Sequence, residues 1–239
     1  MTLDALAIAA HRDDVEQTCG GTLLKMAEQG YRAGVLDLTA GEMGTRGTPE
    51  QRAREAEEAA RILRLHWREN LGLPDARVEN TWENRLLIAA RIRQLRPQIV
   101  FLPYWQGRHP DHCATGALGY EACFLAGLKK LPLEGQPHRP HKILYSTLYY
   151  DVRPSFVVDI TDQFERRLQA LLAYRSQYAD QAEGNELFGS EAEVRQRVET
   201  LARYYGMMVG ARYGEPFLLR ETMLVADPIA EVCRGRPSV

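Results

Sequence analysis

The chain lacks an excess of charge of either sign. Its 239 residues contain 30 Lys and Arg against 32 Asp and Glu, which gives a formal net charge of −2. Without a basic surplus the composition does not favour a nucleic-acid partner, and no long acidic run indicates a solvated tail. We therefore expect a small-molecule partner rather than nucleic acid.

Long hydrophobic stretches are also missing. No apolar run approaches the ~20 residues needed to span a bilayer. The N-terminal segment MTLDALAIAAHRDD has neither the basic region nor the long apolar core of a signal peptide. The protein is expected to be soluble and cytoplasmic, with no membrane partner. Because 45% of the residues are hydrophobic, the chain can bury a substantial core, and we expect one domain over residues 1–239.

Cysteine is scarce and scattered. The four cysteines are Cys19, Cys113, Cys123 and Cys233, and no two of them form a C-x-x-C pair. This spacing argues against a disulfide framework and against a thiolate zinc site. Free thiols in a reducing cytosol are the expectation, so any metal site must draw on other ligands.

Short apolar runs alternate with helical patterns along the chain. Strands are expected at 3–10, 33–39, 66–69 and 98–103, and later in HKILYSTLYY and SFVVDI. Helices are expected at 15–29, 50–65, 82–95, 111–128, 162–178 and 191–208. Alternation with short connections requires right-handed βαβ crossovers. The pattern predicts an α/β, Rossmann-like fold of three layers with a mostly parallel sheet.

Polar side chains follow two of the expected strands directly. LAIAAHRDDVE places His11, Asp13 and Asp14 after the first strand, and IVFLPYWQGRHPDH places His109, Asp111 and His112 after a later one. Ligands of open parallel sheets bind at the carboxyl ends of the strands. Both clusters are therefore expected at one edge of the sheet, and they can meet if their strands are close in the sheet order.

These six side chains offer the chemistry of metal-assisted hydrolysis. A catalytic zinc takes three protein ligands from His, Asp or Glu and leaves a position for water. Of two adjacent carboxylates, one can bind the metal while the other reaches the water, and of two histidines one can serve as an acid. Spacing does not say which group does what. The alternative is that the clusters only cap helices or form loop ion pairs.

Longer blocks of the sequence carry a resemblance. The resemblance is carried by the blocks AAHRDDVE, LDLTAGEMGTRGTPEQRAREAEEAARIL, NLGLPDARVENTWENR, RHPDH and RYYGMMVGARYGEPF. The sequence resembles the LmbE-like, or PIG-L, family of zinc-dependent N-acetylglucosamine deacetylases over nearly the whole chain. The nearest branch looks like the deacetylase of bacillithiol biosynthesis, which acts on N-acetylglucosaminyl-malate. The resemblance implies one Zn²⁺ per chain, with another divalent ion such as Fe²⁺ as an alternative, and a homo-oligomer.

The resemblance also implies roles for the clustered residues. His11, Asp14 and His112 match the metal ligands of the family, Asp13 its general base, and His109 its protonated histidine, which stabilises the oxyanion and protonates the amine, with Asp111 as the partner of His109. Two departures are plain. Arg12 stands where the motif His-Pro-Asp-Asp has proline, and Gly107 stands where the related mycothiol-pathway enzymes have a tyrosine.

A malate aglycone would require cations, preferably arginine. Arg46 in GEMGTRG matches the substrate-binding arginine of the family, Arg108 beside His109 is a second candidate and Arg12 a third. The alternative for each arginine is a solvated surface charge. Other expectations stay open: a chitooligosaccharide-type or mycothiol-like amide as substrate, or a non-catalytic sugar- or nucleotide-binding α/β protein.

Overall fold

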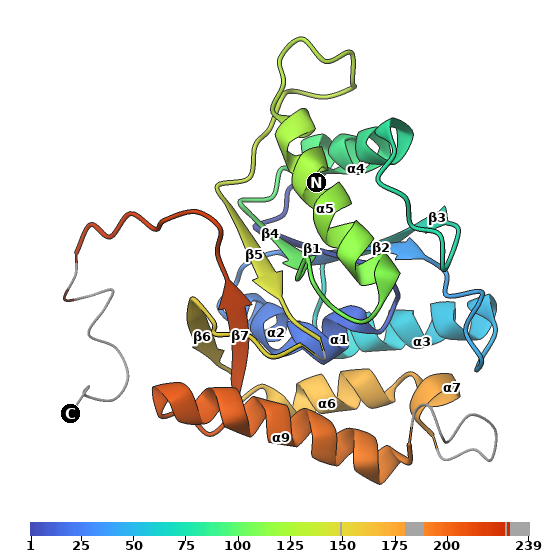
Figure 1. Ribbon diagram of the computed structural model, residues 1–239, viewed down its shortest axis with the longest axis vertical. Coiled ribbons are helices and arrows are strands. Elements are labelled where there is room, and N and C mark those ends of the chain that lie inside the picture. The colour runs from blue at the N-terminus through green and yellow to red at the C-terminus, as the bar shows by residue number, and fades with distance from the viewer. Residues whose placement is uncertain (149, 180–188, 228, 230–239) are drawn as a thin grey trace.

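A computed structural model of the chain describes residues 1–148, 150–179, 189–227 and 229. Within these residues, seven strands form one sheet in the order β3-β2-β1-β4-β5-β7-β6 (Figure 1). The strands are β1 Ala5–Ala9, β2 Ala33–Thr39, β3 Trp67–Leu73, β4 Ile99–Pro103, β5 Lys142–Ser146, β6 Phe156–Asp159 and β7 Gly214–Leu218. The first five run parallel, and β7 is antiparallel to both β5 and β6. The expected α/β fold with a mostly parallel sheet is confirmed.

Helices cover both faces of the sheet. They are α1 Asp14–Thr18, α2 Gly20–Glu28, α3 Pro49–Ile62, α4 Trp82–Leu95, α5 Pro110–Ala126, α6 Phe164–Leu172, α7 Arg175–Tyr178 and α9 Glu191–Val209. Helices α4 and α5 pack together on one face, and α6 packs against α1, α2 and α3 on the other (Figure 1). Because α9 packs against α6 and the strands β6 and β7, these late helices add a layer to the three that were expected. No helix in the described part of the chain is long and apolar enough to cross a membrane.

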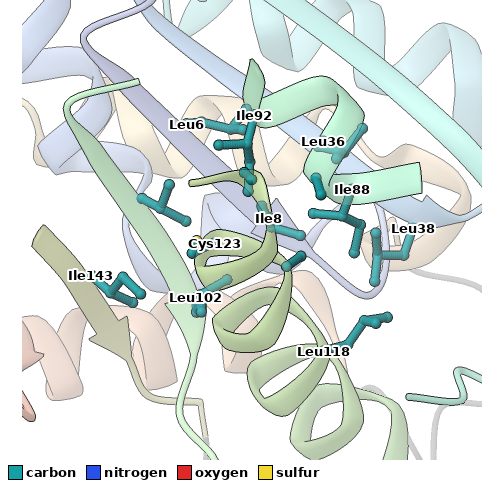
Figure 2. Packing of buried hydrophobic residues seen from close by; sticks show 14 of the residues in the cluster. Leu6, Ile8, Leu36, Leu38, Ile88, Ile92, Leu102, Leu118, Cys123 and Ile143 are labelled. Atoms are coloured by element: carbon teal, nitrogen blue, oxygen red, sulfur yellow. The ribbon is translucent and has the colours of Figure 1, made fainter. Parts of the chain in front are cut away.

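The core explains why the first strands read as unbroken apolar runs. Leu6 and Ile8 of β1 pack with Ile88 and Ile92 of α4 on one face of the sheet (Figure 2). The alternate residues of β1, among them Ala7, pack toward α1 and α2 on the other face. Every residue of β1 and β2 is buried, as expected for parallel strands covered on both sides. Each fully buried leucine or isoleucine contributes about 1.5–3 kcal/mol to folding.

The sheet order brings the two polar clusters together. Strand β1 pairs with β2 on one side and with β4 on the other. The chain order reverses between β1 and β4, which makes the crevice at their carboxyl ends the point where α/β sheets bind ligands. The two strands that precede the polar clusters are therefore direct neighbours.

Three elements differ from the sequence-based expectations. The expected helix 15–29 divides at Cys19 into α1 and α2, where Gly21 and Thr22 donate main-chain hydrogen bonds of 2.9 and 2.7 Å to Glu215. A Cβ on Gly21 would lie 2.9 Å from the Glu215 carboxylate, so close packing requires glycine there. The expected helix 162–178 divides into α6 and α7, and β7 was not predicted because Pro216 lies inside it.

Candidate metal centre and active site

Each polar cluster forms the junction between a strand and a helix. Asp13 precedes α1, and the main-chain N–H of His11 donates to Asp14 Oδ2 over 2.9 Å. His109 precedes α5, and its Nδ1 accepts from the main-chain N–H of Asp111 over 3.3 Å. The capping role considered as an alternative is thus present at His109, whereas the side chain of Asp13 makes no cap hydrogen bond.

Three side chains form a compact donor set. His11 Nδ1 lies 3.2 Å from His112 Nε2 and 3.5 Å from Asp14 Oδ2, and His112 Nε2 lies 3.1 Å from Asp14 Oδ1. Ligands about 2.0–2.1 Å from a tetrahedral zinc are separated from one another by about 3.3 Å. The spacing and chemistry of these atoms therefore fit three ligands of a tetrahedral Zn²⁺ site.

The electrostatics of this donor set favour a positive charge. Burial of the His11 ring opposes protonation, but the carboxylates of Asp14 and Asp75 raise its pKa to about 10. Burial likewise opposes ionisation of Asp14, yet the neighbouring His112 and His11 hold its pKa well below the ordinary value. A divalent cation that displaced the proton would meet the same attraction.

Asp75 is a site residue that the sequence interpretation missed. Its Oδ1 lies 3.0 Å from His11 Nε2, the ring nitrogen that faces away from His112. The hydrogen bond with His11 lowers the pKa of Asp75 to about 2. A carboxylate on the second nitrogen of a metal-binding histidine fixes the ring and its tautomer. Asp75 follows β3 at the same sheet edge, and that position was a sequence signal that could have identified it.

Asp13 lies on the same cavity wall as the donor set, and three donors hold its carboxylate. Arg52 Nη2 lies 3.0 Å from Oδ1, Gln17 Nε2 donates to Oδ2 over 3.3 Å, and the Tyr178 hydroxyl also donates to Oδ2. Arg52 lies within α3, and Tyr178 ends α7. Nothing in their local sequence distinguished Arg52 and Tyr178 from ordinary helix residues, so both were missed.

His109 and Asp111 are arranged differently from the expected pair. The His109 ring centroid lies 4.8 Å from that of His11 and 4.7 Å from that of His112. Asp111 Oδ1 accepts from the main-chain N–H of Val78 over 3.3 Å, and Oδ2 lies 3.7 Å from His11 Nε2. The carboxylate of Asp111 therefore faces His11, and only its main-chain N–H contacts the His109 ring. Burial and the neighbouring His112 and His11 lower the pKa of His109.

A cavity of about 490 Å³ opens over these residues. Its wall includes His11, Asp13, Asp14, Asp75, His109 and His112, the cations Arg52, Arg108 and Arg197, and Tyr178. Of the arginines expected to bind substrate, Arg108 is on this wall. Arg46 is not on the described wall: it is 2% exposed, and its guanidinium donates to the main-chain oxygen of Gln177 over 2.8 Å. A substrate contact of Arg46 stays a prediction.

A buried ionic network supports the loop that carries Arg12. Arg68 makes two hydrogen bonds of 2.8 and 3.0 Å to the Asp37 carboxylate and a third of 2.7 Å to Glu16. The Arg68 guanidinium and the Tyr174 hydroxyl both donate to the main-chain oxygen of Arg12. These bonds hold the main chain at the position where the family motif has proline. The Arg12 side chain is not on the described cavity wall.

Comparisons with known proteins give a consistent result. Residues 6–123 match the family model PIG-L, described as GlcNAc-PI de-N-acetylase. The diacetylchitobiose deacetylase of Thermococcus kodakarensis is 35% identical over 225 residues, which cover 88% of this chain and 80% of that protein. A probable N-acetyl-alpha-D-glucosaminyl L-malate deacetylase of Bacillus cereus is 28% identical over 199 residues, which cover 74% of this chain and 84% of that protein. The crystal structure of a conserved protein from Thermus thermophilus superposes on this chain with a TM-score of 0.86 at 41% sequence identity. The match covers 94% of this chain and 98% of that protein.

Proposed function

The chain belongs to the PIG-L family of deacetylases, and we propose that it removes the N-acetyl group from an N-acetylglucosaminyl conjugate by metal-dependent hydrolysis. The observation that carries this proposal is the donor set of His11, Asp14 and His112, whose spacing fits zinc, beside the separately held carboxylate of Asp13. In the reaction the bond from the acyl carbon to nitrogen breaks. Water supplies the hydroxyl of acetate and the proton of the free amine.

The residues around the cavity have different roles in the reaction. A divalent ion held by His11, Asp14 and His112 would polarise the acetamide carbonyl and lower the pKa of water. Asp13, fixed by Arg52 and Tyr178, accepts the proton of the attacking water.

His109 serves as the hydrogen-bond donor to the reacting carbonyl. Because its Nδ1 accepts from the Asp111 main chain, its Nε2 carries the hydrogen. That hydrogen can be donated to the oxyanion that develops during attack. Asp13, which holds the proton taken from the attacking water, can then donate that proton to the leaving amine.

The aglycone has two candidates. Arg108 and Arg197 on the cavity wall would suit the two carboxylates of malate, and the B. cereus relative is named for that substrate. A second sugar is supported by the T. kodakarensis relative, which has the higher identity and is named for diacetylchitobiose. The amide chemistry is the same for both.

The test is acetate release by the zinc-loaded protein from N-acetylglucosaminyl-malate, diacetylchitobiose and N-acetylglucosamine. Asp13→Asn should bind zinc as the wild type does and lose about 10²–10⁴-fold in kcat, the usual contribution of a general base. Asp162→Asn, on an exposed aspartate, is the matched control and should retain full activity. Failure of the zinc-loaded protein to release acetate from all three compounds would refute the proposal.

A further inference from the structure

A second, much smaller cavity lies directly behind the metal-binding residues. Its volume is about 30 Å³, and its wall includes Asp14 and His112 together with the apolar side chains of Val15, Phe101 and Leu148. Other parts of the wall come from the carboxyl-terminal halves of β1 and β4. Asp14, His112 and Leu148 also border the large cavity over the site. The two cavities therefore adjoin at the metal-binding side chains Asp14 and His112.

We propose that this small cavity receives the methyl of the acetyl group and limits the acyl chain that the enzyme can remove. The inference rests on the proposed function and adds its acyl specificity. An amide carbonyl beside Asp13 and the metal ligands has two substituents of very different size. The hydroxyl-rich sugar requires the open cavity of about 490 Å³, and the methyl suits the small cavity, whose wall is mostly apolar.

The volume sets the limit on chain length. One water-sized group needs roughly 10–15 Å³ of such space. A cavity of about 30 Å³ therefore holds roughly two or three groups of that size. A methyl therefore fits with room for about one further group, and the three-carbon tail of a butyryl group reaches or exceeds the limit.

Leu148 lies between the small cavity and further space, and Thr18 also borders both. Besides bordering the two cavities at the metal site, Leu148 lines a third cavity of about 180 Å³ between α9 and β7. The walls of this third cavity include Val194, Val198 and Leu201, which are apolar. Truncation of Leu148 should join the small cavity to this larger one, because removal of a large side chain leaves a void that its surroundings fill only in part.

The experiment compares kcat/KM for N-acetyl, N-propionyl and N-butyryl forms of one glucosamine conjugate. One methylene too many in a closed pocket lowers kcat/KM by about 10–200-fold. The wild type should therefore hydrolyse the N-butyryl form about 10–200-fold less efficiently than the N-acetyl form. Leu148→Ala should reduce this gap at least about tenfold by gaining activity on the N-butyryl form. Leu148→Val should give an intermediate gap and guards against misfolding of the alanine variant.

Two variants serve as controls. Leu148→Met conserves the volume of the side chain and should keep the wild-type acyl profile. Leu201→Ala removes the same atoms from the α9 side of the third cavity, at a leucine that does not border the small one, and should also keep that profile. Binding of product carboxylates gives a readout without turnover: acetate but not butyrate should raise the Tm of the wild type, and Leu148→Ala should remove this difference.

The outcomes distinguish this inference from the proposed function. Hydrolysis of the N-acetyl form with equal efficiency on the N-butyryl form would overturn the acyl limit and leave the deacetylase proposal intact. An acyl profile that Leu148→Ala and Leu148→Val leave unchanged would overturn the role of Leu148 and its cavity. Failure to hydrolyse any of the three amides would overturn both proposals.

Discussion

Replacement of Asp75 tests whether the donor set binds a metal through a fixed His11 ring. Asp75 Oδ1 accepts from His11 Nε2 over 3.0 Å and from the Ala76 main chain over 2.8 Å, and Oδ2 accepts from the Met43 main chain over 3.0 Å. Asp75→Ala removes both acceptor oxygens and with them all three hydrogen bonds. The His11 ring is then free to rotate and to place its hydrogen on Nδ1, the atom that faces His112 and Asp14.

Asp75→Asn should have a smaller effect. The amide oxygen can still accept from His11 and Ala76, but the negative charge is gone and the amide NH₂ is placed against the N–H of Met43. Partners of metal-binding histidines usually contribute 10–100-fold to metal affinity. We expect a zinc Kd about tenfold higher for Asp75→Asn and about 100-fold higher for Asp75→Ala, which corresponds to about 1.4 and 2.8 kcal/mol.

The assay is competition for zinc against a chromophoric chelator near neutral pH. The exposed aspartate variant Asp162→Asn is the control and should bind zinc as the wild type does. An unchanged zinc Kd in Asp75→Ala would refute the reasoning, because it would mean that the ring of His11 needs no second partner. An equal loss of zinc affinity in Asp75→Asn and Asp75→Ala would refute the expectation that the charge and the acceptor oxygen contribute separately.

Three further predictions concern stability and reactivity. Arg68→Met leaves Asp37 and Glu16 buried without their cation and should lower the free energy of unfolding in urea by about 3–5 kcal/mol. Arg61→Met, in an exposed pair with Glu58, should change this free energy little. Similar losses in the two variants would contradict the difference in burial. Zinc at about 100 times its Kd should raise the free energy of unfolding by about 2.7 kcal/mol, and EDTA should abolish the gain; a gain that persists in EDTA would count against a native metal site. Burial raises the pKa of Cys19, and that of Cys123 to about 12. Peptide mapping after brief thiol alkylation should therefore find Cys113 modified before Cys19 and before Cys123. Early labelling of Cys123 would contradict its burial.

Local sequence features predicted most elements because their causes are local. The helix expected at 82–95 has those bounds in α4, where the Thr81 hydroxyl caps the first turn. Helix α3 begins at Pro49, and Thr48 and Gln51 form a capping box. Such signals lie within a few residues of the element that they define. Strand β7 escaped prediction because Pro216 argues against a strand, while its pairing with β5 and β6 depends on segments far away in the chain.

The candidate site shows the same division between local and distant causes. Six candidates could be selected because metal-binding residue types follow expected strands. The family resemblance then singled out His11, Asp14 and His112, which the structure brings together. The contacts of Asp13 with Arg52 and Tyr178, and that of His11 with Asp75, join residues 39, 165 and 64 positions apart. No pattern in one sequence contains those distances. The same limit applies to Arg46, whose match to the family arginine is visible in the sequence but whose burial against Gln177 is not.

The position of β7 has a consequence for how the chain reaches its native state. Among the described residues, β6 pairs with β7 alone, and β7 is inserted between β5 and β6. During synthesis, β5 therefore presents an open edge, and Phe156–Asp159 has no neighbour until residues 214–218 leave the ribosome. Unpaired edges of this kind expose a nascent polypeptide to wrong pairing. A chain ending before Gly214 should accordingly accumulate in inclusion bodies, although it carries every histidine and aspartate of the donor set.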